Sequence, residues 1–241
     1  MPAANLLRSN LDLPELTEPE VVRYFTNLSQ LNFSIDTHFY PLGSCTMKYN
    51  PKINDEIAST PGLSNLHPMQ PDETVQGALE LMYTLQDYLN EIVGMKGCSL
   101  ATLAGAHGEL AGMLMIRAYH LNRGDSNRDL VLIPDSAHGT NPASATMAGC
   151  RVESIPSNNE GNIDVAVLKE KLSSEVAGVM ITLPNTLGLF ENDITEICNI
   201  AHDAGALVYG DGANMNALLG QVKPGKLGFD VVHINLHKTF S

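Results

Sequence analysis

Short apolar runs alternate with longer amphipathic segments over the second half of the chain. The apolar runs predict buried strands over residues 130–133, 151–155, 179–183, 207–209 and 231–236. Apolar residues at helical spacing predict helices over residues 109–121, 165–172 and 194–204. Strands and helices that alternate in this way indicate parallel βαβ units. The pattern therefore predicts an α/β fold with a mostly parallel sheet and helices on both of its faces.

The first half of the chain shows two helical patterns. A helix is expected over residues 17–32, where Thr17 and Glu20 have the spacing of a capping box. A long helix is expected over residues 72–93, and its apolar face would hold Val75, Leu79, Met82, Leu85 and Leu89.

Residues 36–51 separate these two helices and contain two prolines, a glycine and several small polar residues. This composition predicts a long loop, which in a compact domain is typical of a functional segment. We expect residues 1–35 to form an N-terminal arm and residues 36–241 to form one large domain.

The charge of the chain limits its partners. Among 241 residues, Asp and Glu number 27 and Lys and Arg number 14, which gives a formal net charge of −13. Such an acidic chain repels phosphate backbones and anionic lipids, so we expect no nucleic-acid partner and no membrane partner. No apolar run approaches the roughly 18 residues of a membrane-spanning helix, and the N-terminus lacks the pattern of a signal peptide.

The cysteines are few and far apart. Cys45, Cys98, Cys150 and Cys198 form no CxxC pair, so neither a zinc site nor a disulfide framework is indicated. Free thiols suit a reducing compartment, and we expect a cytoplasmic protein.

Polar side chains follow several of the predicted strands, where ligands bind in open α/β sheets. These candidates are His138, Asn185, Asp211 and Lys238. Asp211 and Lys238 are separated by one crossover connection, so a carboxylate and an amine can converge at one edge of the sheet. Such a pair suits pyridoxal 5'-phosphate, because the amine forms a Schiff base and the carboxylate keeps the pyridine nitrogen protonated. A structural salt bridge is the alternative interpretation.

Gly105, Ala106 and His107 lie at the predicted start of a helix, in the sequence AGAHGE. Bare backbone N–H groups at a helix N-terminus suit a single phosphate, although tight packing explains the same pattern equally well. Neither GxGxxG nor GxxxxGK[ST] occurs, which excludes the Rossmann and P-loop signatures. His138 has a structural interpretation and a functional one, in which its ring stacks on an aromatic cofactor and transfers protons. If His237 and Lys238 remain extended, only Lys238 faces the ligand.

Long stretches such as LGSCTMKYNP, DSAHGTNPAS and NLHKTFS are distinctive. With these residues in place, the sequence resembles the P-protein family of the glycine cleavage system, glycine dehydrogenase (decarboxylating). The likeness is to subunit 2 of the two-subunit form, equivalent to the C-terminal half of the single-chain form, and it covers nearly all of residues 18–241. It implies the aspartate-aminotransferase-like fold, fold type I of the pyridoxal-phosphate enzymes, with residues 36–241 as the large domain that binds the cofactor.

The resemblance also implies roles for single residues. The Schiff-base lysine falls on Lys238, the pyridinium partner on Asp211 and the ring-stacking histidine on His138, with Ala213 under the ring. The turn that binds the phosphate falls on Gly105, Ala106 and His107. The family usually has asparagine in place of Leu183, which leaves Asn185 and Thr186 as cofactor contacts there. The loop at the mouth of the site contains Ser44, Cys45, Thr46 and Lys48.

The implied reaction is the decarboxylation of glycine with release of CO2. The aminomethyl group passes to the lipoyl group of H-protein, whose disulfide is reduced, so the enzyme is an oxidoreductase. His138 is the candidate proton donor for that transfer. Subunit 1 is the implied partner, in a heterotetramer.

The chain stops at Ser241, shortly after Lys238, whereas the family continues into a C-terminal small domain. We therefore expect the small domain to be absent and this chain alone to have little activity. Two alternatives stay open, namely another fold type I decarboxylase or lyase, and a non-catalytic remnant.

Overall fold

The computed structural model describes residues 2–8, 10, 12–38 and 49–240, and the chain divides into two compact units, residues 1–49 and 50–241. The first unit contains a 3-10 turn, η1 (Ala4–Leu6), and the helix α1 (Glu18–Ser29). The predicted capping box is confirmed, because the Thr17 N–H donates to Glu20 Oε2 at 2.8 Å. Most of the predicted loop, including Ser44, Cys45, Thr46 and Lys48, lies outside the described residues.

The second unit is built on a five-stranded parallel sheet. Its strands are β1 (Leu130–Pro134), β2 (Arg151–Ile155), β3 (Val176–Thr182), β4 (Leu207–Gly212) and β5 (Val231–Ile234). They lie in the order β2-β1-β3-β4-β5, and every pair is parallel. The predicted fold class is therefore confirmed. The runs predict β2 in full, whereas β3 begins earlier than predicted and β5 ends earlier.

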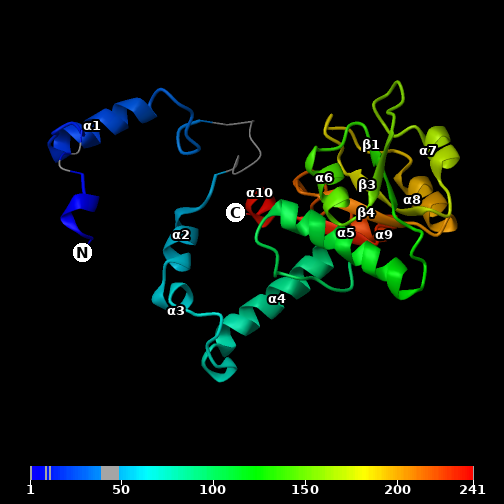
Figure 1. The fold of residues 1–241 in the computed structure, drawn as a ribbon, viewed down its shortest axis with the longest axis horizontal. Helices are drawn as coiled ribbons and strands as arrows, with labels where there is room; N and C mark the ends of the chain where they lie inside the picture. The colour runs from blue at the N-terminus through cyan, green and yellow to red at the C-terminus, as the bar shows by residue number, and fades with distance from the viewer. Residues whose placement is uncertain (1, 9, 11, 39–48, 241) are drawn as a thin grey trace. The chain divides into compact units, whose positions relative to one another are not determined.

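Helices connect the strands and cover the sheet (Figure 1). The longer ones are α4 (Gln76–Val93), α5 (Gly105–Asn122), α6 (Thr140–Met147), α7 (Val165–Lys171) and α8 (Ile194–Asp203). The short ones are α2 (Lys52–Ala58), α3 (Pro61–Ser64), η2 (Asp72–Thr74), α9 (Pro224–Leu227) and α10 (Leu236–Thr239). As predicted, Gly205 follows α8 with a left-handed φ of 79°.

The sheet separates two layers of apolar core. On one face, side chains of α5 and α6 such as Ile116 and Ala145 pack against Val131 and Ile133 of β1. On the other face, side chains of α7 and α8 pack against alternate strand residues such as Leu132. This alternation fixes which strand residues face which layer. It places Tyr209, Asp211 and His233 on the face covered by α5 and α6.

The start of α4 departs from the prediction. The helix begins at Gln76 after the 3-10 turn η2, and Leu79 and Met82 on its predicted apolar face are 41% and 46% exposed. Only its last two turns enter the core, through Leu89 and Val93. The periodicity therefore predicted the helix correctly but overstated how much of it is buried within this unit.

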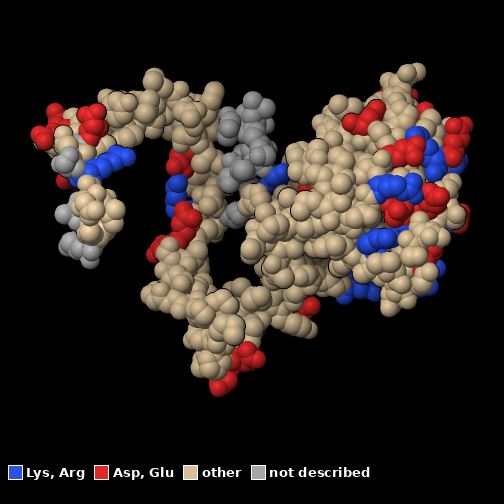
Figure 2. Space-filling model, in the orientation of Figure 1, with Lys and Arg blue, Asp and Glu red and all other residues tan. Residues whose placement is uncertain are grey.

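Acidic and basic side chains are interspersed over the end of the second unit that carries α7 (Figure 2). Lys169 of α7 pairs with Glu196 of α8 at 2.7 Å, and Lys171 pairs with Glu153 of β2. Exposed pairs of this kind contribute little to stability, roughly 0–1 kcal/mol each. Among the residues that the structure describes, no helix combines the length and apolar character needed to cross a membrane.

Candidate active site

A cluster of buried polar side chains lies at the carboxyl end of the sheet. Asp211 near the end of β4 is 4% exposed, and His233 of β5 is its direct neighbour in register. Asn141 of α6 and Glu109 of α5 are also buried, at 0% and 5% exposed. Buried polar groups are expensive unless they are hydrogen-bonded, so their partners define what the cluster can do.

The Asp211 carboxylate is held by N–H donors on both of its oxygens. The backbone N–H of Ala213 donates to Oδ1 at 3.1 Å. The side-chain amide of Asn141, with Nδ2 toward the carboxylates, donates to Asp211 Oδ2 at 3.1 Å and to Glu109 Oε2 at 3.1 Å. Asn141 therefore links two carboxyl groups that come from different elements.

Glu109 has further partners on α6. Thr140 Oγ1 lies 2.8 Å from Glu109 Oε1, and Ser144 Oγ lies 3.4 Å from Oε2. Burial raises the pKa of Glu109 above its ordinary value, and the charge of Asp211 raises it further.

His138 lies in the loop between β1 and α6 and is exposed. Its Nδ1 accepts a hydrogen bond from the backbone N–H of Thr140 at 3.2 Å, and Thr140 Oγ1 lies 2.7 Å from the same nitrogen. Thr140 therefore contacts both His138 and Glu109, and it connects the exposed imidazole with the buried cluster.

The glycines at the start of α5 allow it to pack closely on the sheet. A Cβ on Gly105 would lie 2.7 Å from Asn235 Oδ1, and one on Gly112 would lie 2.6 Å from Tyr209 Cε2. Close packing, one of the two interpretations of AGAHGE, is therefore confirmed at Gly105. The other interpretation, an anion site at the N-terminus of the helix, is compatible with this packing. Gly108 is the first residue of the helix whose N–H reaches a carbonyl of the preceding turn, that of Ala104.

Lys238 does not extend a strand, so the extended conformation considered for His237 and Lys238 is wrong. β5 ends at Ile234, and α10 follows, where the N–H groups of Lys238 and Thr239 donate to the Asn235 carbonyl. Hydrogen bonds within this turn replace the hydrogen bonds between strands. The segment is too short to show a helical periodicity in its sequence. Lys238 is half-buried, and no ion-pair partner of its Nζ is found among the described residues. Burial lowers the pKa of His233 in the cluster, and the charge of Lys238 lowers it further.

Asn185 and Thr186 lie in the loop after β3, outside this cluster. The Asn185 amide donates to the Gly161 carbonyl at 2.9 Å and to Glu191 Oε1 at 3.2 Å. Its Oδ1 accepts from the N–H groups of Leu187 and Leu189, so this side chain is fully bonded, within its own loop and to the loop after β2. Thr186 donates to the Ser136 carbonyl and joins the loops after β3 and β1.

Leu183 lies in the core layer on the α8 side of the sheet and is 3% exposed. It therefore faces away from the layer that contains Asp211. The leucine at this position removes no member of the Asp211 cluster.

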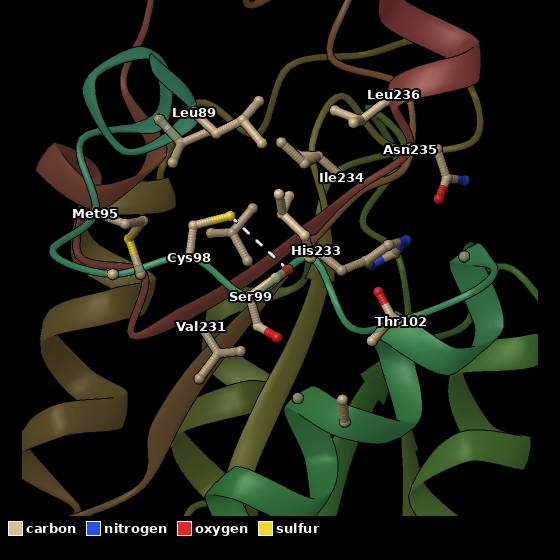
Figure 3. A pocket seen from close by; sticks show the side chains of 18 of the residues that line it. Leu89, Met95, Cys98, Ser99, Thr102, Val231, His233, Ile234, Asn235 and Leu236 are labelled. Carbon is tan, nitrogen blue, oxygen red and sulfur yellow. Dashed lines mark hydrogen bonds between the residues drawn. The ribbon is translucent and has the colours of Figure 1, made fainter. Parts of the chain in front are cut away.

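A cavity of about 780 Å³ borders the cluster, between α4, residues 95–104, α5 and β5. Figure 3 shows His233 and Asn235 at the end of β5, with Thr102 facing them from the segment before α5. The opposite wall is apolar and includes Leu89. The volume of the cavity lies within the range of small-molecule sites.

Sequence reasoning identified Asp211, His138 and Lys238 but missed the buried groups behind them, which are Glu109, Asn141, Tyr209 and His233. Two of these lie inside motifs that the sequence shows clearly, AGAHGE and DSAHGTNPAS. A polar residue on a helix face that packs against a parallel sheet is the sequence signal that could have identified Glu109 and Asn141 as site residues. Their convergence depends on packing between α5, α6 and β4, which spacing along the chain does not reveal.

The sequence is similar along its whole length to glycine dehydrogenase (decarboxylating) subunit 2 of other organisms. The protein of that name from Alkaliphilus oremlandii is 57% identical over 241 residues, which are 100% of this chain and 50% of the relative. The one from Thermococcus kodakarensis is 58% identical over 234 residues, which are 97% and 47% of the two chains. The chain thus spans about half the length of the curated relatives it matches.

Solved structures share the fold. The glycine decarboxylase (P-protein) of the glycine cleavage system, in inhibitor-bound form, superposes with a TM-score of 0.74 at 25% identity, over 96% of this chain and 51% of that one. Oryza sativa TDC with PLP and tryptamine gives 0.67 at 18% identity, over 98% and 56%. The family model described as aminotransferase class-V matches residues 111–241, which is more than half of the chain. The chain therefore belongs to the aminotransferase class-V family.

Proposed function

We propose that this chain carries the pyridoxal-phosphate site of glycine dehydrogenase (decarboxylating), within the large domain formed by residues 36–241. The observation that carries the proposal is the buried Asp211 carboxylate next to the strand that leads to Lys238. The identity of 57% over the whole chain to subunit 2 of that enzyme supports the same conclusion.

The donors present fit pyridoxal phosphate. Lys238 offers an amine without an ion-pair partner among the described residues, and Asp211 offers a carboxylate fixed by Ala213 and Asn141. The N-terminus of α5 at Gly105, Ala106 and His107 offers a site for a phosphate. The amine matches the aldehyde of the cofactor, the carboxylate matches its ring nitrogen, and the helix N-terminus matches its phosphate.

When bound, pyridoxal phosphate supplies an electron sink for the bond between Cα and the carboxylate of glycine. Lys238 would hold the cofactor covalently, and Asp211 would hold the proton on the ring nitrogen. His138 would stack on the ring, and Ala213 would lie under it. His138 would present Nε2 to the reacting atoms, because its Nδ1 is engaged by Thr140. We propose no cofactor contact for the Asn185 amide, which is fully bonded, and retain Thr186 as a candidate contact.

The finer partners belong to the proposal as well. We propose glycine as the substrate, lipoylated H-protein as the acceptor of the aminomethyl group, and subunit 1 as a stable partner in a heterotetramer. The relatives' name, glycine dehydrogenase (decarboxylating) subunit 2, supports glycine as the substrate and a second subunit as the partner. The free thiols of Cys98, Cys150 and Cys198 support a cytoplasmic location.

The test is to reconstitute the chain with pyridoxal phosphate, reduce it with borohydride and map the labelled peptide by mass. We expect the label on Lys238, its loss in Lys238→Arg and its retention in Lys226→Arg, a matched lysine on the short helix α9. Exchange of bicarbonate into glycine is then measured with subunit 1 and lipoylated H-protein present. Label on another lysine overturns the cofactor site. Correct label with decarboxylation of a different amino acid overturns the glycine assignment alone.

A further inference from the structure

A continuous path of short contacts connects His138 with Asp211 through Glu109. Thr140 Oγ1 lies 2.7 Å from His138 Nδ1 and 2.8 Å from Glu109 Oε1. The amide of Asn141 then joins Glu109 Oε2 to Asp211 Oδ2, at 3.1 Å on each side. Glu109 is thus the only carboxyl group that the described residues place between the imidazole and Asp211.

The hydrogens available along this path determine its protonation. The backbone N–H of Thr140 donates to His138 Nδ1, so that nitrogen carries no proton. The Thr140 hydroxyl has a single hydrogen and can donate to Nδ1 or to Glu109 Oε1, not to both. With Nδ1 unprotonated, the contacts of Thr140 Oγ1 with His138 Nδ1 and with Glu109 Oε1 are both hydrogen bonds only when Glu109 carries a proton on Oε1. Glu109 then donates this proton to Thr140 Oγ1.

The other half of Glu109 is consistent with a carboxylic acid. Oε2 accepts from Asn141 Nδ2, with Ser144 Oγ at 3.4 Å, and needs no proton of its own. Glu109 is 5% exposed, and the same amide that bonds it also bonds Asp211. Two ionised carboxylates that share one amide in a buried site repel each other, so a proton on one of them stabilises the pair.

A second buried glutamate gives the contrast. Glu191 is 2% exposed, and its oxygens accept from the Asn185 amide and from the backbone N–H of Ile163. Its hydrogen-bond partners among the described residues are all N–H donors, so an ionised carboxylate satisfies them. The hydroxyl contact is what distinguishes Glu109.

We propose that Glu109 is a positioning residue that fixes His138 as the Nε2–H tautomer and stores a proton for it. In the resting state Glu109 donates to Thr140 Oγ1, which donates to His138 Nδ1. When His138 Nε2 gives its proton to a reacting atom, Nε2 is left with a lone pair and becomes a hydrogen-bond acceptor. The hydrogen of the Thr140 hydroxyl then moves to Nδ1 while the proton of Glu109 moves to Oγ1. The imidazole is neutral again and Glu109 is ionised, so charge and protons balance.

The charged groups around this path come from four segments, which are β4, the loop after β1, β5 and α10. Asp211 of β4 and His138 of the loop after β1 act directly on Glu109. His233 of β5 faces Asp211, and Lys238 acts on His233. The role of the stored proton in the reaction rests on the proposed function, whereas its location does not.

The location is tested in the chain without cofactor. Infrared difference spectra should show the carbonyl band of a protonated carboxylic acid that disappears in Glu109→Gln and persists in Glu191→Gln. Nitrogen NMR should show Nδ1 as an acceptor and Nε2 as protonated, in the wild type and in Glu109→Gln alike, because a glutamine amide donates to Thr140 as the acid does. A band that survives Glu109→Gln, or a proton on His138 Nδ1, overturns the proposal whatever the enzyme catalyses.

The supply of the proton is tested by kinetics. Glu109→Gln and Thr140→Val should each lower glycine–bicarbonate exchange by about 10- to 100-fold, the scale of a lost proton-transfer step. Because the two groups act in series, the double variant should be no slower than either single variant. Thr140→Ser keeps the hydroxyl and should restore most of the rate. Additive losses, or no rescue by serine, would mean that these residues only support the fold.

Discussion

His233 Nε2 faces Asp211 Oδ1 across neighbouring strands at 3.5 Å. On its other side, His233 Nδ1 lies 2.5 Å from the Tyr209 hydroxyl, and the two rings stack with centroids 5.9 Å apart. Burial raises the pKa of the Tyr209 phenol, which therefore remains a donor, and burial lowers the pKa of His233. A tyrosine that donates to Nδ1 leaves the proton of His233 on Nε2, directed at the carboxylate.

Tyr209→Phe should reduce stability through this contact. The substitution removes the donor to His233 Nδ1 and leaves a buried nitrogen unpaired, which costs about 1–3 kcal/mol. Urea unfolding measures the effect. Tyr119→Phe is the matched control, because the half-exposed Tyr119 of α5 bonds through its hydroxyl to the Arg123 side chain and to no other described residue. We expect the control to change stability by less than about 0.5 kcal/mol, and equal losses would contradict the role of Tyr209.

Asp211→Asn should separate attachment of the cofactor from its chemistry. Lys238 is untouched, so borohydride should still fix the label there. Glycine–bicarbonate exchange should fall by about 100-fold or more, because a charge-assisted hydrogen bond of about 3 kcal/mol is lost. Retention of the exchange rate would show that the ring nitrogen needs no anionic partner.

Gly112→Ala should destabilise the protein although alanine favours helices. The new Cβ would lie 2.6 Å from Tyr209 Cε2 and 3.1 Å from Val231 Cγ1, in a packed layer. Overpacking of this kind costs about 1–3 kcal/mol. Gly77→Ala in α4 has nothing within 4 Å of its Cβ and should stabilise the helix by up to about 1 kcal/mol. Thermal unfolding should therefore move in opposite directions for the two variants.

The sequence predicted well those elements that local pattern determines. β2 and the start of α8 follow from continuous apolar runs and helical spacing, and Gly205 marks the end of α8 because only glycine adopts its left-handed φ without strain. The start of α5 was predicted too late, at Glu109 rather than Gly105. Glycine and alanine weaken the periodic signal there, and the small size of Gly105 and Gly108 serves packing against Asn235 and His233, which lie far away in sequence.

The candidate site was predictable only in part, for the same reason. Asp211 and His138 follow strands, and the rule for parallel sheets selects such positions. Glu109 and His233 entered the site through tertiary contacts, since α5 packs across β4 and β5. Hydrogen-bond partners such as Thr140 depend on ångström-scale placement, which residue spacing does not encode.

His120 of α5 is fully buried. Its Nε2 donates to the Ala177 carbonyl at 2.8 Å, and Asp125, Arg123 and Arg128 are the charged groups that act on it. Burial lowers the pKa of His120 below its ordinary value, so the folded state resists a proton that the unfolded state accepts. Stability from this group is complete above the unfolded pKa of about 6.5 and is lost as the pH falls below it, by up to about 1.4 kcal/mol per pH unit.

His120→Gln should therefore flatten the decline in the free energy of unfolding between about pH 7 and about pH 5, the window below the ordinary histidine pKa. Part of the decline should remain, because burial also lowers the pKa of His233. Glu109 acts in the opposite direction, since a raised carboxyl pKa favours the folded state as the pH falls. Comparison of each variant with the wild type at the same pH cancels these common contributions. His67→Gln, at an exposed position, should keep the wild-type slope. Urea unfolding at each pH decides the matter, and a slope in His120→Gln equal to that of the wild type would show that His120 does not resist protonation.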